Sequence, residues 1–303
     1  MPYGKVDPYT LIIIGAGGDL ALRKLLPSLY RLHAKGMMGI SYAILGVDAD
    51  EKDDGAYRAA VSETLKLSGP SDSDEAISGW CDKHLFYQPV ASSTGDYEGL
   101  GNRISTIEQA HNLPGNRVFY LAVPSEAFGP VIERLGKSGL NRSRGWTRLV
   151  IEKPFGADLA SARKLNAAIH RHFDESQIYR IDHFLGKEMV QNILAFRFAN
   201  AIFEPVWNHK YIQSIEITTA EKLGLEDRVA YYEKAGALRD MVQGHLTQLL
   251  TLIAMESPTT FEAAVIRTEK LKVLRKISPL QPPRRHPGTI CPRHHRWRGG
   301  TRL

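Results

Sequence analysis

The stretch IIIGAGGDL, residues 12–20, decides the fold class of this chain, because it reads as a buried strand, a glycine-rich turn and the start of a helix. A turn of this kind lets phosphates approach backbone N–H groups at the positive end of the helix. Gly15, Gly17 and Gly18 are therefore candidate binders of a nucleotide phosphate. Their spacing is not G-x-G-x-x-G, so the turn alone is a weak motif, and its glycines can equally serve packing.

Strands and helices alternate on both sides of this turn over roughly the first 180 residues. Strand character extends over residues 9–15, 41–48, 84–90, 116–124 and 147–156. Helical segments are expected over 20–35, 50–80, 95–112, 124–140 and 158–173, with Asp158 as the N-cap of the last. Pro27 predicts a kink or a late start in the first helix. This alternation predicts a doubly wound parallel sheet, in an α/β Rossmann-like dinucleotide-binding domain.

The pattern changes after residue 180. Helical spacing marks residues 187–200 and 237–256, and 269–277 predicts a last short element. Residues 211–221 alternate polar and apolar side chains, which predicts an antiparallel strand with one exposed face. The apolar stripe expected on the helix 237–256 is Leu238, Met241, Val242, Leu249 and Ile253.

These patterns predict three segments. Residues 1–180 are expected to form the dinucleotide-binding domain. Residues 181–280 are expected to form a partial substrate and dimerisation domain, an incomplete α+β domain with an antiparallel sheet. Residues 281–303 are expected to be a basic, irregular tail, because the apolar period there gives way to Pro, Arg and His.

Charge is distributed unevenly along the chain. The net charge is +6, but ten basic and no acidic residues lie between Lys270 and Leu303, which leaves 29 basic against 33 acidic residues elsewhere. Because the body of the chain is mildly acidic, we expect no nucleic-acid partner, and RNA binding by the tail is the weaker interpretation. Cys291, His294 and His295 lack a fourth ligand with recognisable spacing, so we expect no metal site.

The sequence lacks the features of a membrane or secreted protein, which indicates its cellular compartment. No apolar run approaches the length of a membrane span, and the N-terminus has neither the charged nor the apolar region of a secretory signal. The two cysteines, Cys81 and Cys291, lie far apart and form no disulfide framework. We therefore expect a cytoplasmic protein with no membrane partner.

Charged residues follow two of the expected strands, at the sheet edge where open α/β sheets bind ligands. Asp48 and Asp50 follow the second strand, where an acid hydrogen-bonds a free ribose 2′-hydroxyl and an Arg would favour a 2′-phosphate. Two solvated loop acids are an equally good interpretation. Glu152 and Lys153 end the fifth strand, where Lys153 can contact a ligand or simply form a surface ion pair.

The stretch RIDHFLGKEMVQNI, residues 180–193, groups an acid, an imidazole and an ammonium within six positions. His183 and Lys187 are four residues apart, so on one helix they share a face, and two cations near a helix N-terminus can bind a phosphate. Asp182 can orient another imidazole, as a carboxylate does for a catalytic histidine. His245, on the apolar stripe of the helix 237–256, is the candidate, although a lone histidine there is more often a core residue.

Together these motifs resemble the glucose-6-phosphate dehydrogenase family. GAGGDLALRKLLPSLYRL resembles its nucleotide loop GxxGDLxxRKLxPxLY, and IEKPFG resembles its EKPFG strand end. RIDHFLGKE is similar to its substrate signature RIDHYLGKE, and YYEKAGALRDMVQGHLTQLL resembles its YY-x-x-x-GALRDM-x-QNH-x-x-Q-x-L helix. The resemblance covers roughly residues 9–280.

The resemblance implies oxidation of glucose 6-phosphate at C1 to 6-phosphogluconolactone, with hydride transfer to NADP or NAD, as the first step of the oxidative pentose phosphate pathway. His245 would be the general base, with Asp182 orienting it. His183 and Lys187 would hold the 6-phosphate, and Lys153 would touch both sugar and cofactor. The remaining implied contacts are Glu221 and Asp240 with sugar hydroxyls, and Gly15, Gly17, Gly18, Asp19, Leu20 and Asp48 with the cofactor. Members of the family have a large antiparallel sheet that continues beyond the residues matched here. The resemblance implies a homodimer or homotetramer if assembly does not require that missing part of the sheet.

The sequence departs from the family pattern at several positions. Phe184 stands where the signature has Tyr, Gly244 where it has the Asn before the base, and Gly17 where it has Ser or Thr. No Arg stands at the second strand end, so NAD use, or use of both cofactors, is a live hypothesis. Residues 278–303 are typical of an out-of-frame reading of a GC-rich gene, which predicts a frameshifted or truncated product.

Two alternatives to an active enzyme of this family remain open. One is a nucleotide-binding remnant with no turnover. The other is a dehydrogenase of a different sugar phosphate. The His183 and Lys187 pair argues against an unphosphorylated sugar as the substrate.

Overall fold

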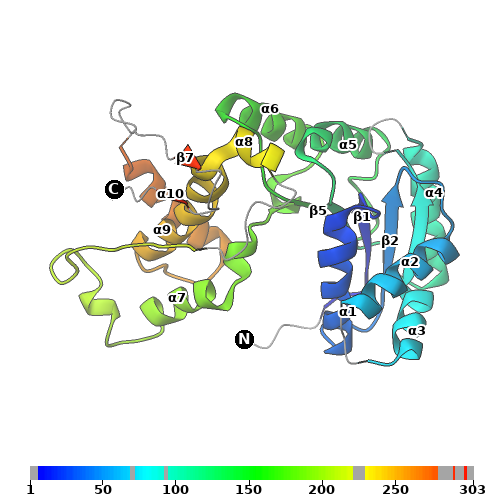
Figure 1. Ribbon diagram of the computed structural model, residues 1–303, viewed down its shortest axis with the longest axis horizontal. Helices are drawn as coiled ribbons and strands as arrows, with labels where there is room; N and C mark the ends of the chain where they lie inside the picture. The colour runs from blue at the N-terminus through cyan, green and yellow to red at the C-terminus, as the bar shows by residue number, and fades with distance from the viewer. Residues whose placement is uncertain are drawn as a thin grey trace. The chain divides into compact units, whose positions relative to one another are not determined.

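A computed structural model describes residues 6–68, 72–91, 95–220, 229–278, 289–290 and 297–298 of the chain (Figure 1). The chain divides into two compact units, Met1–Ile181 and Asp182–Leu303, which we describe separately as unit 1 and unit 2. Within the described part of the chain, no helix is both long and apolar enough to cross a membrane.

Unit 1 is built on a six-stranded parallel sheet with the order β3-β2-β1-β4-β5-β6. The strands are β1 (Tyr9–Ile14), β2 (Tyr42–Asp48), β3 (Leu85–Pro89), β4 (Arg117–Leu121), β5 (Thr147–Ile151) and β6 (Ile178–Arg180). This is the strand order of the Rossmann fold, so the predicted dinucleotide-binding architecture is confirmed. The short edge strand β6 was not predicted, because three residues are too few for an apolar period to be recognised.

Helices cover both faces of this sheet (Figure 1). They are α1 (Leu26–Ala34), α2 (Asp54–Leu67), α3 (Asp74–His84), α4 (Tyr97–Ala110), α5 (Ser125–Lys137) and α6 (Leu159–His170). Asp158 caps α6 by accepting the Ser161 N–H at 2.8 Å, as predicted. The predicted helix 50–80 is two helices, α2 and α3. Before α1, residues Ala21–Leu25 form a π-type segment, η1, which agrees with Pro27 having no N–H to continue an α-helical ladder.

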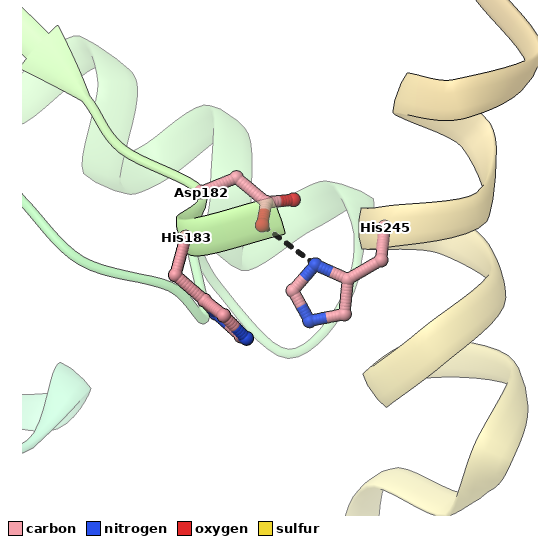
Figure 2. Close-up of side chains that lie close together, drawn as sticks. All are labelled: Asp182, His183 and His245. Carbon is pink, nitrogen blue, oxygen red and sulfur yellow. Dashed lines mark ion pairs between the residues drawn. The ribbon is translucent and has the colours of Figure 1, made fainter. Parts of the chain in front are cut away.

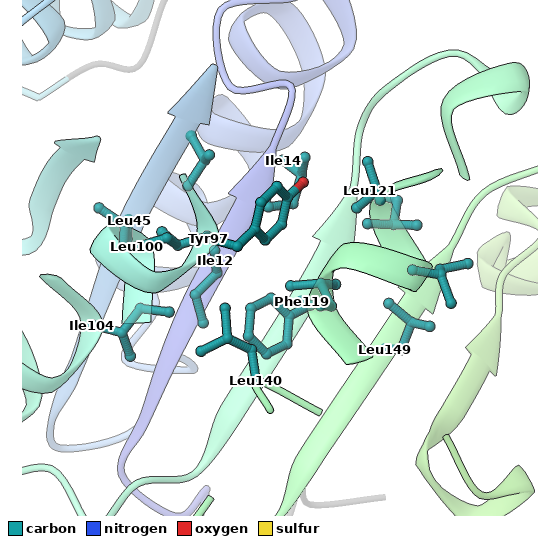
Figure 3. Packing of buried hydrophobic residues seen from close by; sticks show 14 of the residues in the cluster. Ile12, Ile14, Leu45, Tyr97, Leu100, Ile104, Phe119, Leu121, Leu140 and Leu149 are labelled. Carbon is teal, nitrogen blue, oxygen red and sulfur yellow. The ribbon is translucent and has the colours of Figure 1, made fainter. Parts of the chain in front are cut away.

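The central strand β1 contributes to two separate cores because its side chains alternate between the faces of the sheet. Ile12 and Ile14 pack with residues of α4, α5 and α6, as Figure 3 shows for part of that cluster. Leu11 and Ile13 pack with residues of η1, α1, α2 and α3. A strand covered on both faces must be apolar at every position, which explains the continuous run that opens the sequence motif.

Unit 2 is mainly helical in its described residues. Its elements are η3 (His183–Gly186), α7 (Glu188–Phe198), η4 (Glu204–Val206), α8 (Val229–Ala237), η6 (Leu238–Leu246), α9 (Thr247–Ala254) and α10 (Ala263–Lys276). Phe184, Val190, Leu249, Leu252 and Met255 form its core. Buried Arg197 donates to the Leu252 carbonyl at 2.8 Å and the Trp207 indole N–H donates to the Ile253 carbonyl at 2.8 Å. These bonds satisfy carbonyls at the C-terminal end of α9, which would otherwise lack partners.

The expected antiparallel strand over 211–221 is not found, since residues 211–220 adopt no strand. Alternation specifies the faces of a strand, but a strand also needs a hydrogen-bonded neighbour. Among the described residues of unit 2, only the two-residue strands β7 (Thr289–Ile290) and β8 (Trp297–Arg298) pair, and they pair with each other. Ile217 instead packs against the helical core.

Candidate active site

Asp182 and His245, far apart in the sequence, meet in unit 2 (Figure 2). Asp182 Oδ1 lies 2.6 Å from His245 Nδ1, and their side chains are 12% and 2% exposed. The same oxygen accepts the Phe184 backbone N–H at 3.0 Å, because Asp182 is the N-cap of η3. The carboxylate is thus held in place by the backbone. With Nδ1 donating to the carboxylate, Nε2 of a neutral imidazole is left to accept a proton.

The winding of η6 brings a second acid onto the same buried side as His245. The prediction for 237–256 was an α-helix, but Leu238–Leu246 is π-helical and only Thr247–Ala254 is α-helical. In an i→i+5 pattern, residues five apart lie nearly above one another. Asp240 and His245 have this spacing, and both are buried, at 6% and 2% exposed. The same winding leaves Leu238, expected on the apolar stripe, 53% exposed.

The ring of Phe184 contacts three polar side chains of the site. It stacks on the His245 imidazole at 3.9 Å between centroids, with 14° between the planes. His183 meets its edge at 4.9 Å, and Lys187 Nζ lies 3.5 Å from its centroid. Phe184 is itself only 5% exposed. A buried aromatic ring therefore fixes the plane of the imidazole and carries an ammonium on its surface.

His183 and Lys187 lie on the exposed side of this cluster, but not on one helix face as predicted. His183 opens the 3₁₀ turn η3, and Lys187 is an extended residue between that turn and α7. Although they do not share a helix face, both side chains contact Phe184, because a 3₁₀ turn is followed by an extended residue. Lys187 is also the N-cap residue of α7, so its backbone lies at the positive end of that helix, where an anion can bind.

Asp182, His183 and His245 offer ligand atoms that all lie within 4.8 Å of one another. Imidazole and carboxylate are donor types that zinc uses. The 2.6 Å separation of Asp182 Oδ1 and His245 Nδ1, however, is that of a charge-assisted hydrogen bond. A proton between Asp182 Oδ1 and His245 Nδ1 therefore explains why these two atoms lie so close together.

The candidate nucleotide turn lies at the carboxyl end of β1, between the ends of β2 and β4. The Gly15 N–H donates to the Val47 carbonyl at 2.8 Å, and its φ is +92°. A Cβ on Gly15 would lie 2.7 Å from the Ala122 carbonyl oxygen, so only glycine fits. Strand order reverses beside β1, which is where open α/β sheets bind ligands. The turn therefore fits the phosphates of a dinucleotide.

Asp48 is built into this turn. Its Oδ2 accepts the Gly17 N–H at 2.7 Å and its Oδ1 accepts the Ala49 N–H at 2.8 Å. Asp50, by contrast, pairs with Lys52 at 2.9 Å. Asp48 is thus the acid that stays fixed at the end of β2, where a Rossmann fold contacts the adenosine ribose.

The remaining predicted site residues are placed as follows. Asp19 is exposed and pairs with Arg23 at 3.2 Å, one turn along, and Leu20 is 38% exposed beside it. Lys153 is half-buried after β5 in unit 1. Glu221 lies outside the described residues, as do Cys291, His294 and His295.

Two polar groups near the sites were missed by the sequence analysis. Tyr120 on β4 donates to Glu152 Oε1 at 2.6 Å, and burial, reinforced by this carboxylate, raises the pKa of its hydroxyl. Lys270 on α10 is the first of the ten basic residues near the C-terminus, but it is half-buried, donates to Gln248 and interacts with Asp182. The helical period of α10 was the available signal, since it places Lys270 beside apolar Ile266 and Val273 of the core.

Two family models match nearly the whole chain. Residues 12–192 match the glucose-6-phosphate dehydrogenase NAD-binding domain. Residues 194–294 match the glucose-6-phosphate dehydrogenase C-terminal domain. The chain belongs to the glucose-6-phosphate dehydrogenase family. Its first unit is accordingly of the kind that binds NAD or NADP, as predicted.

Individual members of the glucose-6-phosphate dehydrogenase family are closely similar. Glucose-6-phosphate 1-dehydrogenase of Bacillus subtilis is 48% identical over 271 residues, which are 89% of this chain and 54% of the relative. The Aggregatibacter actinomycetemcomitans enzyme is 44% identical over 278 residues, or 91% and 56% of the two chains. The chain therefore spans about half the length of the curated relatives it matches.

Solved structures of the family resemble the whole fold. A glucose-6-phosphate dehydrogenase in complex with its substrate glucose 6-phosphate superposes with a TM-score of 0.84 at 34% identity, over 93% of this chain and 58% of that one. The Mycobacterium avium enzyme superposes with a TM-score of 0.77 at 35% identity, over 88% and 57%.

Proposed function

We propose that this chain oxidises glucose 6-phosphate at C1 to 6-phosphogluconolactone, with NADP or NAD as hydride acceptor, the first step of the oxidative pentose phosphate pathway. The observation that carries the proposal is the buried pair of Asp182 and His245, 2.6 Å apart, beside the exposed side chains of His183 and Lys187. Relatives named glucose-6-phosphate 1-dehydrogenase support the substrate and the reaction.

The reaction divides into a proton transfer and a hydride transfer. Nε2 of His245 takes the proton of the C1 hydroxyl while Asp182 stabilises the imidazolium that forms. The C1–H bond breaks, its electron pair leaves with the hydrogen as hydride, and C1 becomes the lactone carbonyl carbon. The dinucleotide, when bound, supplies the hydride acceptor. Phe184, stacked on the ring at 3.9 Å, keeps the imidazole in one plane during the transfer.

The phosphate end of the substrate is assigned to His183 and Lys187. Both side chains are exposed, and Lys187 occupies the N-cap position of α7. An ammonium and an imidazole at a helix N-terminus suit a phosphate dianion. Binding there, remote from C1, positions the reacting carbon at the base. Asp240 is buried on the His245 side of η6, which supports its assignment to a sugar hydroxyl. Glu221 is assigned to a hydroxyl and Lys153 to sugar and cofactor on the family resemblance alone.

We further propose a cytoplasmic location, a homodimer or homotetramer, an antiparallel sheet in the second domain and a division into three segments at residues 180 and 280.

The test measures reduced nicotinamide by absorbance with glucose 6-phosphate and either NADP or NAD. We expect turnover that His245→Ala abolishes. We expect Asp182→Asn to lower kcat on the order of a hundredfold or more with little change in KM, because the imidazolium loses its carboxylate. Phe173→Leu in the core of unit 1 is the control for general destabilisation. No turnover from a folded wild-type sample would assign the chain to the nucleotide-binding remnant.

A further inference from the structure

Lys270 is held close to the Asp182–His245 pair. It lies on α10, its ammonium donates to Gln248 Oε1, and Gln248 follows His245 by three residues on the same helical run. α9 and α10 pack against each other through Leu249, Ile266 and Val273. The hydrogen bond therefore fixes the Lys270 ammonium relative to the turn of helix that carries the base.

The electrostatic partner of Lys270 is Asp182. Burial lowers the pKa of Lys270, and the Asp182 carboxylate acts in the opposite direction. The acid beside Lys270 on its own helix, Glu269, pairs instead with Lys272 at 2.6 Å. A half-buried ammonium thus interacts with the same carboxylate that bonds His245.

We propose that Lys270, held by Gln248, is a positioning residue whose ammonium offsets the Asp182 carboxylate and so keeps the His245 imidazole neutral at the pH of catalysis. The inference rests on the proposed function, in which His245 is the base. A carboxylate at Nδ1 favours the protonated imidazolium, which cannot accept a proton. A cation facing that carboxylate weakens this preference without breaking the hydrogen bond that orients the ring.

Other charges around the imidazole do not replace Lys270 in this role. His183, from η3, lies 4.8 Å from the His245 ring and offers a ring nitrogen within 4.8 Å of the Asp182 carboxylate, but its side chain is exposed, so water screens any charge it carries. Lys187 lies over the Phe184 ring. Asp240, on the same π-helical segment as His245, is a second buried acid and adds no positive charge. Lys270, by contrast, is half-buried and interacts with Asp182, so its charge is less screened.

The experiment compares Lys270→Met with wild type in two readouts. The first is the titration midpoint of His245, followed by NMR of labelled imidazoles and assigned with His245→Gln. The second is the acid limb of kcat/KM against pH. We expect both to move to higher pH in Lys270→Met, by about half a pH unit or more, as removal of one charge from a partly screened interior requires. Lys270→Arg should stay near wild type.

Matched variants separate positioning from packing. Lys276→Met removes the same charge from an exposed position of α10 and should move neither readout. Gln248→Leu should move both in the direction of Lys270→Met, because it releases the ammonium. A folded Lys270→Met or Gln248→Leu protein with an unmoved His245 midpoint would overturn the proposal and leave Lys270 a link between α9 and α10. Because the NMR readout needs no turnover, a chain that lacks activity fails the proposed function without deciding this inference.

Discussion

The ring of Phe184 lies between a buried part and a solvent-exposed part of the candidate site. The imidazole of His245 stacks on its ring in the core of unit 2, whereas Lys187 lies over the ring and is exposed. A base that is shielded from water keeps its orientation, and a cation that is open to water can take a phosphate from solution. Single substitutions should therefore affect chemistry and substrate binding separately.

Replacing Lys187 by Met should raise KM for glucose 6-phosphate about tenfold or more, with kcat nearly unchanged. The ammonium supplies a charge-assisted bond to the phosphate, worth roughly 1.5–3 kcal/mol, and does not touch C1. Steady-state kinetics checks this, with exposed Lys210→Met as the control. An unchanged KM would remove Lys187 from the phosphate site.

Replacing Asp48 by Asn should increase use of NADP relative to NAD about tenfold. The amide oxygen can still accept the Gly17 N–H that Asp48 Oδ2 accepts at 2.7 Å, but it does not repel a ribose 2′-phosphate. Asp50→Asn is the matched control, since Lys52 already offsets that charge at 2.9 Å. The ratio of kcat/KM for the two cofactors is the measurement, and equal effects of both variants would contradict the assignment.

At the scale of elements, α1, α3 and β2 are joined by a polar cluster around Tyr42. The Trp80 indole N–H donates to the Tyr42 hydroxyl oxygen at 2.9 Å, and the same hydroxyl forms a hydrogen bond with His33 Nδ1 at 2.7 Å. His84 Nδ1 donates to the Tyr42 carbonyl at 3.0 Å. Burial disfavours the charged form of both imidazoles, so the packing of these elements favours neutral histidines.

This cluster should make folding less stable at acid pH. Burial, with nearby Lys83 in addition, lowers the pKa of His33 from 6.5; burial also lowers the pKa of His84. As the pH falls, these histidines therefore bind protons at a higher pH in the unfolded chain than in the folded chain. Their contribution to stability is present above pH 6.5 and is lost as the pH falls below it.

Denaturant unfolding at pH 5 and pH 7.5 measures this loss. We expect a lower free energy of unfolding at pH 5, and a smaller difference between the two pH values in the double variant His33→Gln/His84→Gln. Equal pH dependence in the variant and the wild type would assign the acid sensitivity to other groups.

At the scale of the molecule, each unit has a hydrophobic core of its own and carries one of the two candidate binding regions. The dinucleotide turn lies in unit 1, and the His245 cluster lies in unit 2. A ligand stabilises the segments that contact it against local opening. Hydrogen exchange can therefore assign each ligand to its unit.

We expect NAD or NADP to slow amide exchange over residues 12–20 and glucose 6-phosphate to slow it over residues 182–190. Peptide-level mass spectrometry after exchange measures both, with each ligand added separately to the full chain. Slower exchange at 182–190 with the dinucleotide alone, and none at 12–20, would contradict the assignment of the Gly15 turn to the cofactor.

The sequence by itself determined the Rossmann half and the family. A parallel strand buried on both faces must be apolar throughout, so β1 was recognisable from local pattern, and the RIDHFLGKE signature identified the family without a structure. The candidate base was also nameable in advance, because His245 lies within a family motif.

Only the tertiary structure decided how the site is assembled. The π-helical winding that aligns Asp240 with His245, the inward placement of Lys270 and the absence of a strand over 211–220 each depend on contacts between segments distant in the chain. Local periodicity records which face of an element is apolar. It does not record whether a strand finds a hydrogen-bonded partner, or which carboxylate a half-buried ammonium meets, because those partners are brought together by folding.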